Sequence, residues 1–296
     1  GGTGIAVSHG AESALANPGL ITSIKNTEIS FGGTIFMPNV ESTLGVEKTA
    51  SSDADLNVIP SVSIGSKVNS NFYWGIGMWG TAGMGVDYRE VNHGSSARNN
   101  YNMVTNLQLM QFGMPLAYTK DSFSIALTPI VQYGSLDIDF NNSGNRHTGI
   151  SQDLKLGFNI GMSYKISDIT FGVIYKSKID MEYSDQITSA GSEFGLTLGE
   201  NLSTPSEIGL GVSYTIGKHL LALDYKKVNW SSAEGYKDFM WQDQNVFALG
   251  YEFRSDMWSA RVGYNYAKSP IEEQLPSPNG YAINALNILG FLSLLL

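Results

Sequence analysis

The stretch Lys155–Lys165, KLGFNIGMSYK, alternates between large apolar side chains and small or polar ones at every step. Successive side chains of a β-strand point to opposite faces, so this stretch predicts a strand with one apolar face and one small, polar face. The same alternation recurs in Ile208–Ile216 and in Trp258–Tyr266. A chain organised in this way is predicted to be all-β.

Alternation bounded by turn residues marks about eleven strands along the chain. They are Thr27–Met37, Leu56–Val68, Phe72–Tyr88, Met103–Tyr118, Phe123–Phe140, Ser151–Ile166, Ile169–Tyr183, Ser206–Ile216, His219–Trp230, Asn245–Arg254 and Met257–Ala267. Short turns such as Ser167-Asp168 alternate with long polar loops such as Glu90–Asn102 and Ser184–Thr204. Short turns at one end and long loops at the other are typical of outer-membrane barrels.

Two architectures place the apolar faces differently. A soluble sandwich buries them in a core, whereas a membrane barrel turns them towards lipid and lines its lumen with the polar face. Aromatic residues near the strand ends, as in an interfacial girdle, favour the barrel. They are Tyr164, Tyr175, Tyr214, Trp258 and Tyr266. The second face is rich in Gly, Ser and Thr and poor in Lys and Glu, which also indicates a transmembrane antiparallel β-barrel.

Composition excludes several kinds of partner and site. The net charge of −9 argues against a nucleic-acid partner, and the absence of cysteine excludes Cys-ligated metals. The four histidines share no ligand spacing, so no metal site is predicted. Gly75–Gly80 fits G-x-G-x-x-G, but no helix follows it, so we expect no dinucleotide cofactor. No run of about 18 apolar residues occurs, which excludes a transmembrane helix.

The segment Gly4–Leu20 does not resemble the rest of the chain. It is made of small residues, is weakly helical and ends in Asn17-Pro18-Gly19, where proline lacks a donor and glycine tolerates positive φ. We therefore predict a plug over residues 1–26 and a barrel over residues 27–296.

Several motifs, in order along nearly the whole chain, resemble the FadL/TodX family of outer-membrane transporters. Gly2–Ala6 followed by Ala16–Leu20 resembles the family's hatch, with Gly19 as the small residue after Pro18. The further matches are Tyr175-Lys176-Ser177, Leu202–Pro205, Val228–Ser231, Leu249–Tyr251, Arg261–Tyr264 and Ser269–Ile271. The resemblance implies a fourteen-stranded barrel with a hatch, in the outer membrane of a Gram-negative bacterium. It also implies a monomer that takes up hydrophobic compounds passively, without cofactor or enzymatic activity.

The resemblance also implies site residues. Asn17, Pro18 and Gly19 would belong to the hatch. The glycines of the third strand would form a kink that opens the wall sideways, although crowding around the plug explains them equally well. Those glycines are Gly80, Gly83 and Gly85. An outer apolar groove would be formed by residues of the loop Ser184–Thr204, namely Phe194, Leu196, Leu198 and Leu202.

Three cations fall on lumen faces by parity, Lys176, Lys178 and Arg261. Lys178 and Arg261 are candidates to bind a substrate carboxylate. Alternatively, these cations pair with lumen acids such as Asp224 or Asp180. Long-chain fatty acids are the expected cargo, with aromatic hydrocarbons as the alternative within the family. A general diffusion porin is a third possibility, against which the Asn17-Pro18 segment argues.

The C-terminal stretch Ile288–Leu296 ends without the terminal aromatic residue that completes the last strand in the family. We therefore expect the last strands of the barrel to be missing from this chain.

Overall fold

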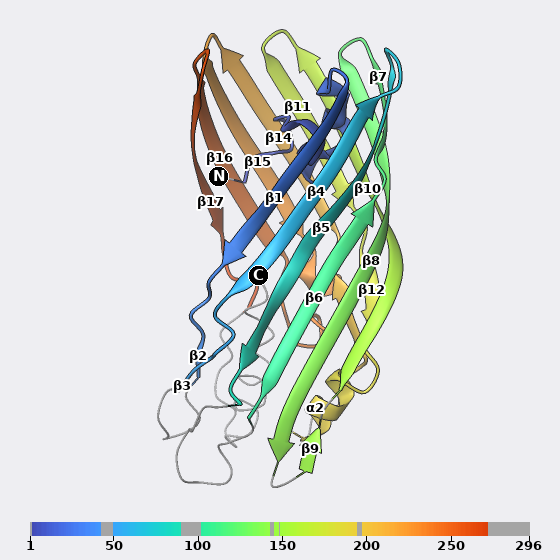
Figure 1. The fold of residues 1–296 in the computed structure, drawn as a ribbon, viewed down its shortest axis with the longest axis vertical. Coiled ribbons are helices and arrows are strands. Elements are labelled where there is room, and N and C mark those ends of the chain that lie inside the picture. The colour runs from blue at the N-terminus through green and yellow to red at the C-terminus, as the bar shows by residue number, and fades with distance from the viewer. Residues whose placement is uncertain are drawn as a thin grey trace.

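The computed structural model describes residues 2–42, 50–89, 102–142, 145–147, 149–193 and 197–271. Most of its strands form one antiparallel sheet that curls into a barrel, with consecutive strands side by side (Figure 1). The strands of this barrel sheet are β1 (Thr27–Phe36), β4 (Asn57–Lys67), β5 (Phe72–Asp87), β6 (Val104–Gly113), β7 (Leu116–Lys120), β8 (Phe123–Asn142), β9 (Asn145–His147), β10 (Ile150–Ile166), β11 (Ile169–Lys176), β14 (Glu207–Ile216), β15 (His219–Val228), β16 (Gln244–Arg254) and β17 (Ser259–Ala267). Every predicted strand therefore has a counterpart.

Smaller elements occupy the two ends and the interior. They are the N-terminal turns η1 (Gly10–Glu12), α1 (Ser13–Ala16) and η2 (Pro18–Ser23), the short strands β2 (Glu41–Ser42), β3 (Ala50–Ser51), β12 (Ile179–Glu182) and β13 (Asn201–Thr204), and the helical segments α2 (Ile187–Glu193) and η3 (Trp230–Ser232). In the part of the chain that the structure describes, no helix is long and apolar enough to cross a bilayer.

The apolar faces of the strands point outwards, as the alternation predicts. On β10, Leu156 is 76% exposed whereas Asn159, on the opposite face, is 6% exposed. All five of the aromatic residues predicted to form an interfacial girdle are exposed on the outer face. A soluble sandwich would bury this face, so the structure favours the membrane barrel.

Two predicted strands are interrupted in the structure. Met103–Tyr118 was expected to be continuous, but β6 ends at Gly113 and β7 begins at Leu116, after Pro115. Ile169–Tyr183 was expected to be continuous, but β11 ends at Lys176 and β12 pairs with β13 in a separate two-stranded sheet. Pro205, just before β14, lacks the N–H that the next rung of the β11–β14 ladder would use. In addition, the Ser177 hydroxyl accepts the hydrogen bond from the Phe158 amide (2.9 Å). The chain therefore leaves the wall after β11, and β12 buries Met181 completely.

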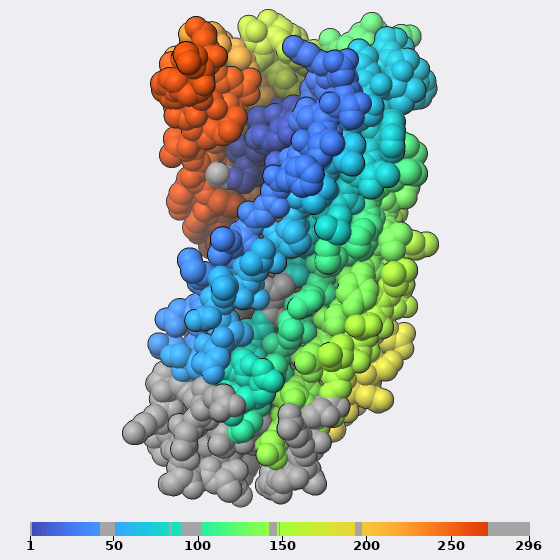
Figure 2. Space-filling model, in the orientation of Figure 1, coloured from blue at the N-terminus to red at the C-terminus, as the bar shows by residue number. Residues whose placement is uncertain are grey.

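The long loop Ser184–Thr204 is therefore not simply a polar connection. Its described part contains α2 and β13, and Leu202 on β13 is buried with β12 and Trp230 in the main internal cluster. In Figure 1 the short turns lie at the upper end of the barrel and the long connections at the lower end. Figure 2 shows the N-terminal segment lying between β1 and β17, towards the short-turn end.

Candidate functional site

The N-terminal segment, residues 2–26, is fastened inside the barrel by Asn17. This side chain is fully buried, and its Nδ2 donates to the carbonyl oxygens of Ile5 (2.7 Å) and of Met162 on β10 (3.0 Å). Its Oδ1 accepts from the amide of Gly19 (3.0 Å). Pro18 starts η2, where its missing donor costs nothing. Asn17 therefore links the segment both to itself and to the wall.

Glycines on three neighbouring strands make room for this segment. A Cβ at Gly161 on β10 would overlap Asn17 Oδ1, and a Cβ at Gly172 on β11 would overlap the Ile5 carbonyl oxygen. At Gly211 on β14, a Cβ would lie 2.8 Å from Ile5 Cβ. Close backbone approach is a recognised reason for glycine within a strand. The small face seen in the sequence therefore includes the surface on which the N-terminal segment packs.

Asp224 on β15 holds the start of the segment. Its Oδ2 accepts from the backbone amides of Gly4 (2.7 Å) and Ile5 (2.9 Å), and the residue is 2% exposed. On β14, the Ser213 hydroxyl donates to the Ala6 carbonyl oxygen (2.8 Å). The sequence suggested Asp224 as a partner for lumen cations, but its carboxylate is bound to backbone amides instead.

The third strand, β5, contains a bulge at Thr81. Gly80 pairs with Met110 and Ala82 with Leu109, so Thr81 has no partner on β6. An extra residue reverses the faces of a strand. The buried positions accordingly change from odd numbers, as at Tyr73 and Trp79, to even numbers, as at Val86 and Tyr88.

The bulge coincides with the end of the β4–β5 ladder, at the pair Ser61–Trp79. The next residue on β4 is Pro60, which has no N–H to donate. Among the described residues, β5 therefore pairs only with β6 between Gly80 and Val86, opposite Asn57–Pro60 of β4. We call this interruption the ladder gap.

Of the three glycines predicted to form a kink, Gly80 borders the bulge. Gly83 and Gly85 pair in regular register with Gln108 and Asn106 on β6, so the irregularity does not lie at these two positions.

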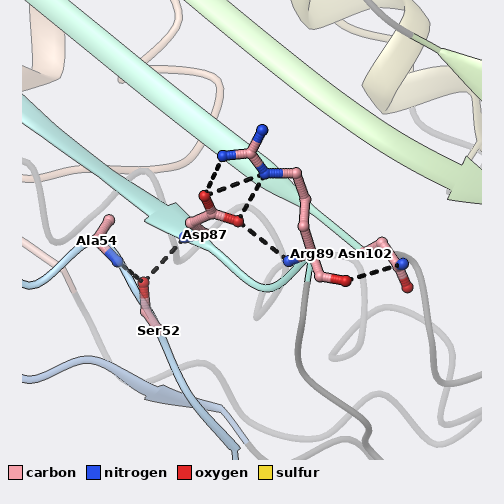
Figure 3. Close-up of polar contacts among 5 residues, drawn as sticks. All are labelled: Ser52, Ala54, Asp87, Arg89 and Asn102. Carbon is pink, nitrogen blue, oxygen red and sulfur yellow. Dashed lines mark hydrogen bonds and ion pairs between the residues drawn. The ribbon is translucent and has the colours of Figure 1, made fainter.

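The end of the ladder gap that lies near the long connections is closed by polar contacts around Asp87 (Figure 3). The Ser52 hydroxyl accepts from the amides of Asp87 (2.9 Å) and Ala54 (3.1 Å), and the amide of Asp53 donates to the Asp87 carbonyl oxygen (2.9 Å). The Asp87 carboxylate forms an ion pair with Arg89. The gap is therefore bounded at both ends.

A cavity of about 390 Å³ connects the N-terminal segment with the ladder gap. Leu15 and Ala16 of α1 form one wall, and the bulge residues Gly80–Ala82 form another. The remaining large apolar and aromatic lining residues are Leu107, Leu109, Leu202, Trp230 and Tyr236. The lining also includes polar residues, namely Thr81, Gln111, Asn159, Ser177, Ser203 and Thr204. The cavity is therefore a compartment of mixed polarity between the N-terminal segment and the ladder gap.

The charged groups lining the cavity do not cancel. Lys176 Nζ lies 3.4 Å from Glu207 Oε2, which forms one ion pair. Lys226 also lines the cavity, is half-buried, and forms no ion pair within the described part of the chain. The lining thus contains one more lysine than acid.

The chain was then compared with known proteins. Residues 2–278 match the model of the family described as outer membrane protein transport protein (OMPP1/FadL/TodX). The chain belongs to the FadL/TodX family. It is therefore an outer-membrane β-barrel of the Gram-negative type that transports hydrophobic compounds. No curated protein sequence matches the chain.

Solved structures show the same fold. The toluene transporter TbuX of Ralstonia pickettii superposes with a TM-score of 0.67 at 16% identity, covering 91% of this chain and 84% of that one. The toluene transporter TodX of Pseudomonas putida gives 0.67 at 15%, covering 90% and 81%. A Pseudomonas aeruginosa FadL homologue gives 0.65 at 15%, covering 91% and 78%.

In this FadL/TodX barrel, the two predicted carboxylate-binding cations lie at opposite ends. Lys178 Nζ lies 2.9 Å from Asp180 Oδ1, beyond the loop end of β11. Arg261 forms an ion pair with Glu252 at 3.0 Å, towards the short-turn end. Neither residue lines the cavity, so the structure does not bring them together.

The predicted outer groove is described only in part. Leu198 packs, half-buried, against the internal cluster, whereas Phe194 and Leu196 lie outside the described residues. The described residues contain no group of three or more potential metal ligands. Sequence reasoning did not identify the cavity residues Lys226, Trp230 and Tyr236; only Trp230 lies within a quoted motif, Val228–Ser231, and that motif did not assign it to a cavity.

Proposed function

We propose that this FadL/TodX protein mediates passive uptake of long-chain fatty acids across the outer membrane. The observation that carries the proposal is the cavity lining, in which two lysines, Lys176 and Lys226, accompany one acid, Glu207, beside the apolar residues of α1, β6 and β13. A fatty acid combines a carboxylate with a long apolar chain. A charge-assisted hydrogen bond from Lys226 would hold the carboxylate, while the chain would contact Leu107, Leu109 and Leu202.

The route follows from the features that border the cavity. Displacement of the hatch, residues 2–26, would open the cavity on the side of α1. The ladder gap beside Gly80–Ala82 would allow a hydrophobic molecule to leave sideways into the membrane. Such transport needs no nucleotide, because the substrate moves between apolar environments and avoids water. The predicted loop groove around Leu198 would provide the first contact from outside.

Uptake of labelled oleate and labelled toluene by cells without their own transporter tests the proposal. We expect Lys226→Met to lower oleate uptake at limiting concentration by about tenfold, because a hydrogen bond to a charged group contributes about 1.5–3 kcal/mol. Toluene uptake should not fall, since toluene has no anionic group. Lys218→Met is the matched control, because Lys218 lies in an exposed turn and pairs with Asp256. Unchanged oleate uptake by the Lys226 variant would contradict the fatty-acid assignment.

Aromatic hydrocarbons are the second candidate cargo. Trp230 and Tyr236 line the cavity with ring centroids 4.7 Å apart, and Trp241 packs against both rings. Aromatic walls suit a planar apolar ligand. Toluene uptake without oleate uptake would support this alternative. Leakage of small sugars would instead indicate a diffusion porin, against which the hatch in the lumen argues.

A further inference from the structure

A second element occupies the lumen besides the hatch. It is the two-stranded sheet formed by β12 and β13, which we call the inner sheet. Leu202–Thr204 of β13 line the cavity, as Leu15 and Ala16 of α1 do. The hatch lies towards the short-turn end, whereas β12 and β13 belong to the long connection between β11 and β14. The cavity therefore lies between the hatch and the inner sheet.

Two glycines of the wall make room for the inner sheet. On β8, a Cβ at Gly134 would lie 2.8 Å from Met181 Cε and would overlap the Tyr183 hydroxyl. On β10, a Cβ at Gly157 would lie 2.5 Å from Ile179 Cδ1. Met181 is completely buried and Ile179 is 3% exposed. The inner sheet therefore packs directly on the wall, with no passage between them.

Few polar contacts hold the inner sheet to this wall. The fully buried Gln132 on β8 donates from Nε2 to the Thr204 hydroxyl (2.8 Å), which donates in turn to Gln132 Oε1 (3.2 Å). At a solvent-exposed position, Asp153 Oδ2 accepts from the amide of Glu182 (2.8 Å). Within the described residues, these are the side-chain hydrogen bonds between the wall and β12–β13. On the buried side, Gln132 thus supplies the polar contact.

The docked position of the inner sheet also has a cost. Tyr183 directly follows β12 and is completely buried, and its hydroxyl has no hydrogen-bond partner in the described part of the chain. A buried polar group without a partner has lost its hydrogen bonds to water, which destabilises the state that buries it. Movement of the inner sheet away from Gly134 would return the hydroxyl to water. Docking is therefore favoured by Gln132 and opposed by Tyr183.

We propose that the inner sheet is the outer gate of the cavity, and that its movement away from β8 and β10 admits cargo from the loop end. Gln132 is a positioning residue that holds the gate closed. The hatch closes the cavity towards the short-turn end, so a molecule in the cavity lies between two separately held barriers. The gate acts before the cavity contacts the cargo, so the proposal is independent of the fatty-acid assignment.

Two substitutions should shift the gate in opposite directions. Met181→Cys places a thiol beneath the docked inner sheet, in a chain without native cysteine. Gln132→Met removes both hydrogen bonds to Thr204 with little change of shape, and should speed maleimide labelling of this thiol about tenfold. Tyr183→Phe removes only the unpartnered hydroxyl, and should slow labelling about tenfold.

Matched controls separate the gate from the barrel wall. Gln108→Met makes the same replacement at an exposed position on the outer face of β6, and should leave the labelling rate of residue 181 unchanged. Ala126→Cys, buried on β8, should label slowly in every background. Equal acceleration at residues 126 and 181 would show that Gln132→Met loosens the wall, and would overturn the proposal. An unchanged rate at residue 181 in both the Gln132 and the Tyr183 variants would overturn it as well.

Uptake separates the gate from the cargo site. Any compound that enters the cavity from outside must pass the gate, so Tyr183→Phe should lower uptake of oleate and of toluene by a similar factor, whichever of them the protein carries. Lys226→Met should affect oleate alone. Slower labelling of residue 181 without any change in uptake would show that the inner sheet is not on the route. That result would overturn the gate and leave the fatty-acid assignment standing.

Discussion

Replacement of Asp224 by alanine should release the hatch. Asp224 Oδ2 accepts two backbone amides, from Gly4 and Ile5, in a buried position. A hydrogen bond to a charged group contributes about 1.5–3 kcal/mol, so the loss of two costs the docked hatch at least about 3 kcal/mol. Because 1.4 kcal/mol is a factor of ten, the equilibrium for hatch opening should rise roughly 140-fold. Asp224→Asn keeps an uncharged acceptor, and hydrogen bonds to ions are about twice as strong as neutral ones, so its effect should be roughly tenfold.

The absence of native cysteine makes hatch opening measurable by thiol labelling. Val7 is 5% exposed and packs with Leu220 and Ala222, so a Val7→Cys thiol is protected while the hatch is docked. If opening and closing are fast, the rate of reaction with a maleimide follows the opening equilibrium. Ala126→Cys, a buried position on β8 in the barrel wall, is the matched control and should label slowly in every background.

Two outcomes would refute this reasoning. An unchanged labelling rate at residue 7 in the Asp224→Ala protein would show that the two hydrogen bonds do not hold the hatch. Faster labelling at both residue 7 and residue 126 would show that the substitution loosens the barrel rather than the hatch. The ratio of the two rates is therefore the decisive quantity.

Two further predictions concern the hatch and the ladder gap. Gly161→Ala should displace the hatch, because the added Cβ would overlap Asn17 Oδ1, and labelling of the Val7→Cys thiol should become faster. Gly199→Ala is the control, because a Cβ there meets no atom within 4 Å, and it should leave the labelling rate unchanged. A disulfide between Ile59→Cys and Gly80→Cys, where a Cβ at residue 80 would lie 2.7 Å from Ile59 Cγ2, should close the gap and reduce uptake until a reductant is added. Equal uptake by the oxidised and reduced proteins would show that substrate leaves elsewhere.

The wall of the barrel could be predicted from the sequence because its signals are local. Alternation with a period of two and turn residues at the strand ends both act within a few residues. The predicted Thr27–Met37 accordingly corresponds to β1, Thr27–Phe36, and His219–Trp230 to β15, His219–Val228. The outward direction of the apolar face also follows, because the opposite face contains few side chains suited to a packed core.

The features of the third strand could not be located from its own sequence. Five glycines between Gly75 and Gly85 suggested an irregular strand, but the bulge lies at Thr81, which is not a glycine. The ladder next to it ends at Pro60, which belongs to the neighbouring strand and becomes relevant only once the register is known. The inward turn after β11 depends in the same way on Pro205, across the ladder.

The charges of β15 show most clearly why sequence alone did not define the site. Asp224 and Lys226 lie two residues apart on the lumen face, where opposite charges would be expected to neutralise each other. The carboxylate is instead occupied by amides of Gly4 and Ile5, about 220 residues earlier in the chain, and the lysine lines the cavity without an ion pair in the described chain. No local pattern predicts a contact between residues so far apart in the sequence, so the hydrogen bonds of Asp224 could be found only from the structure.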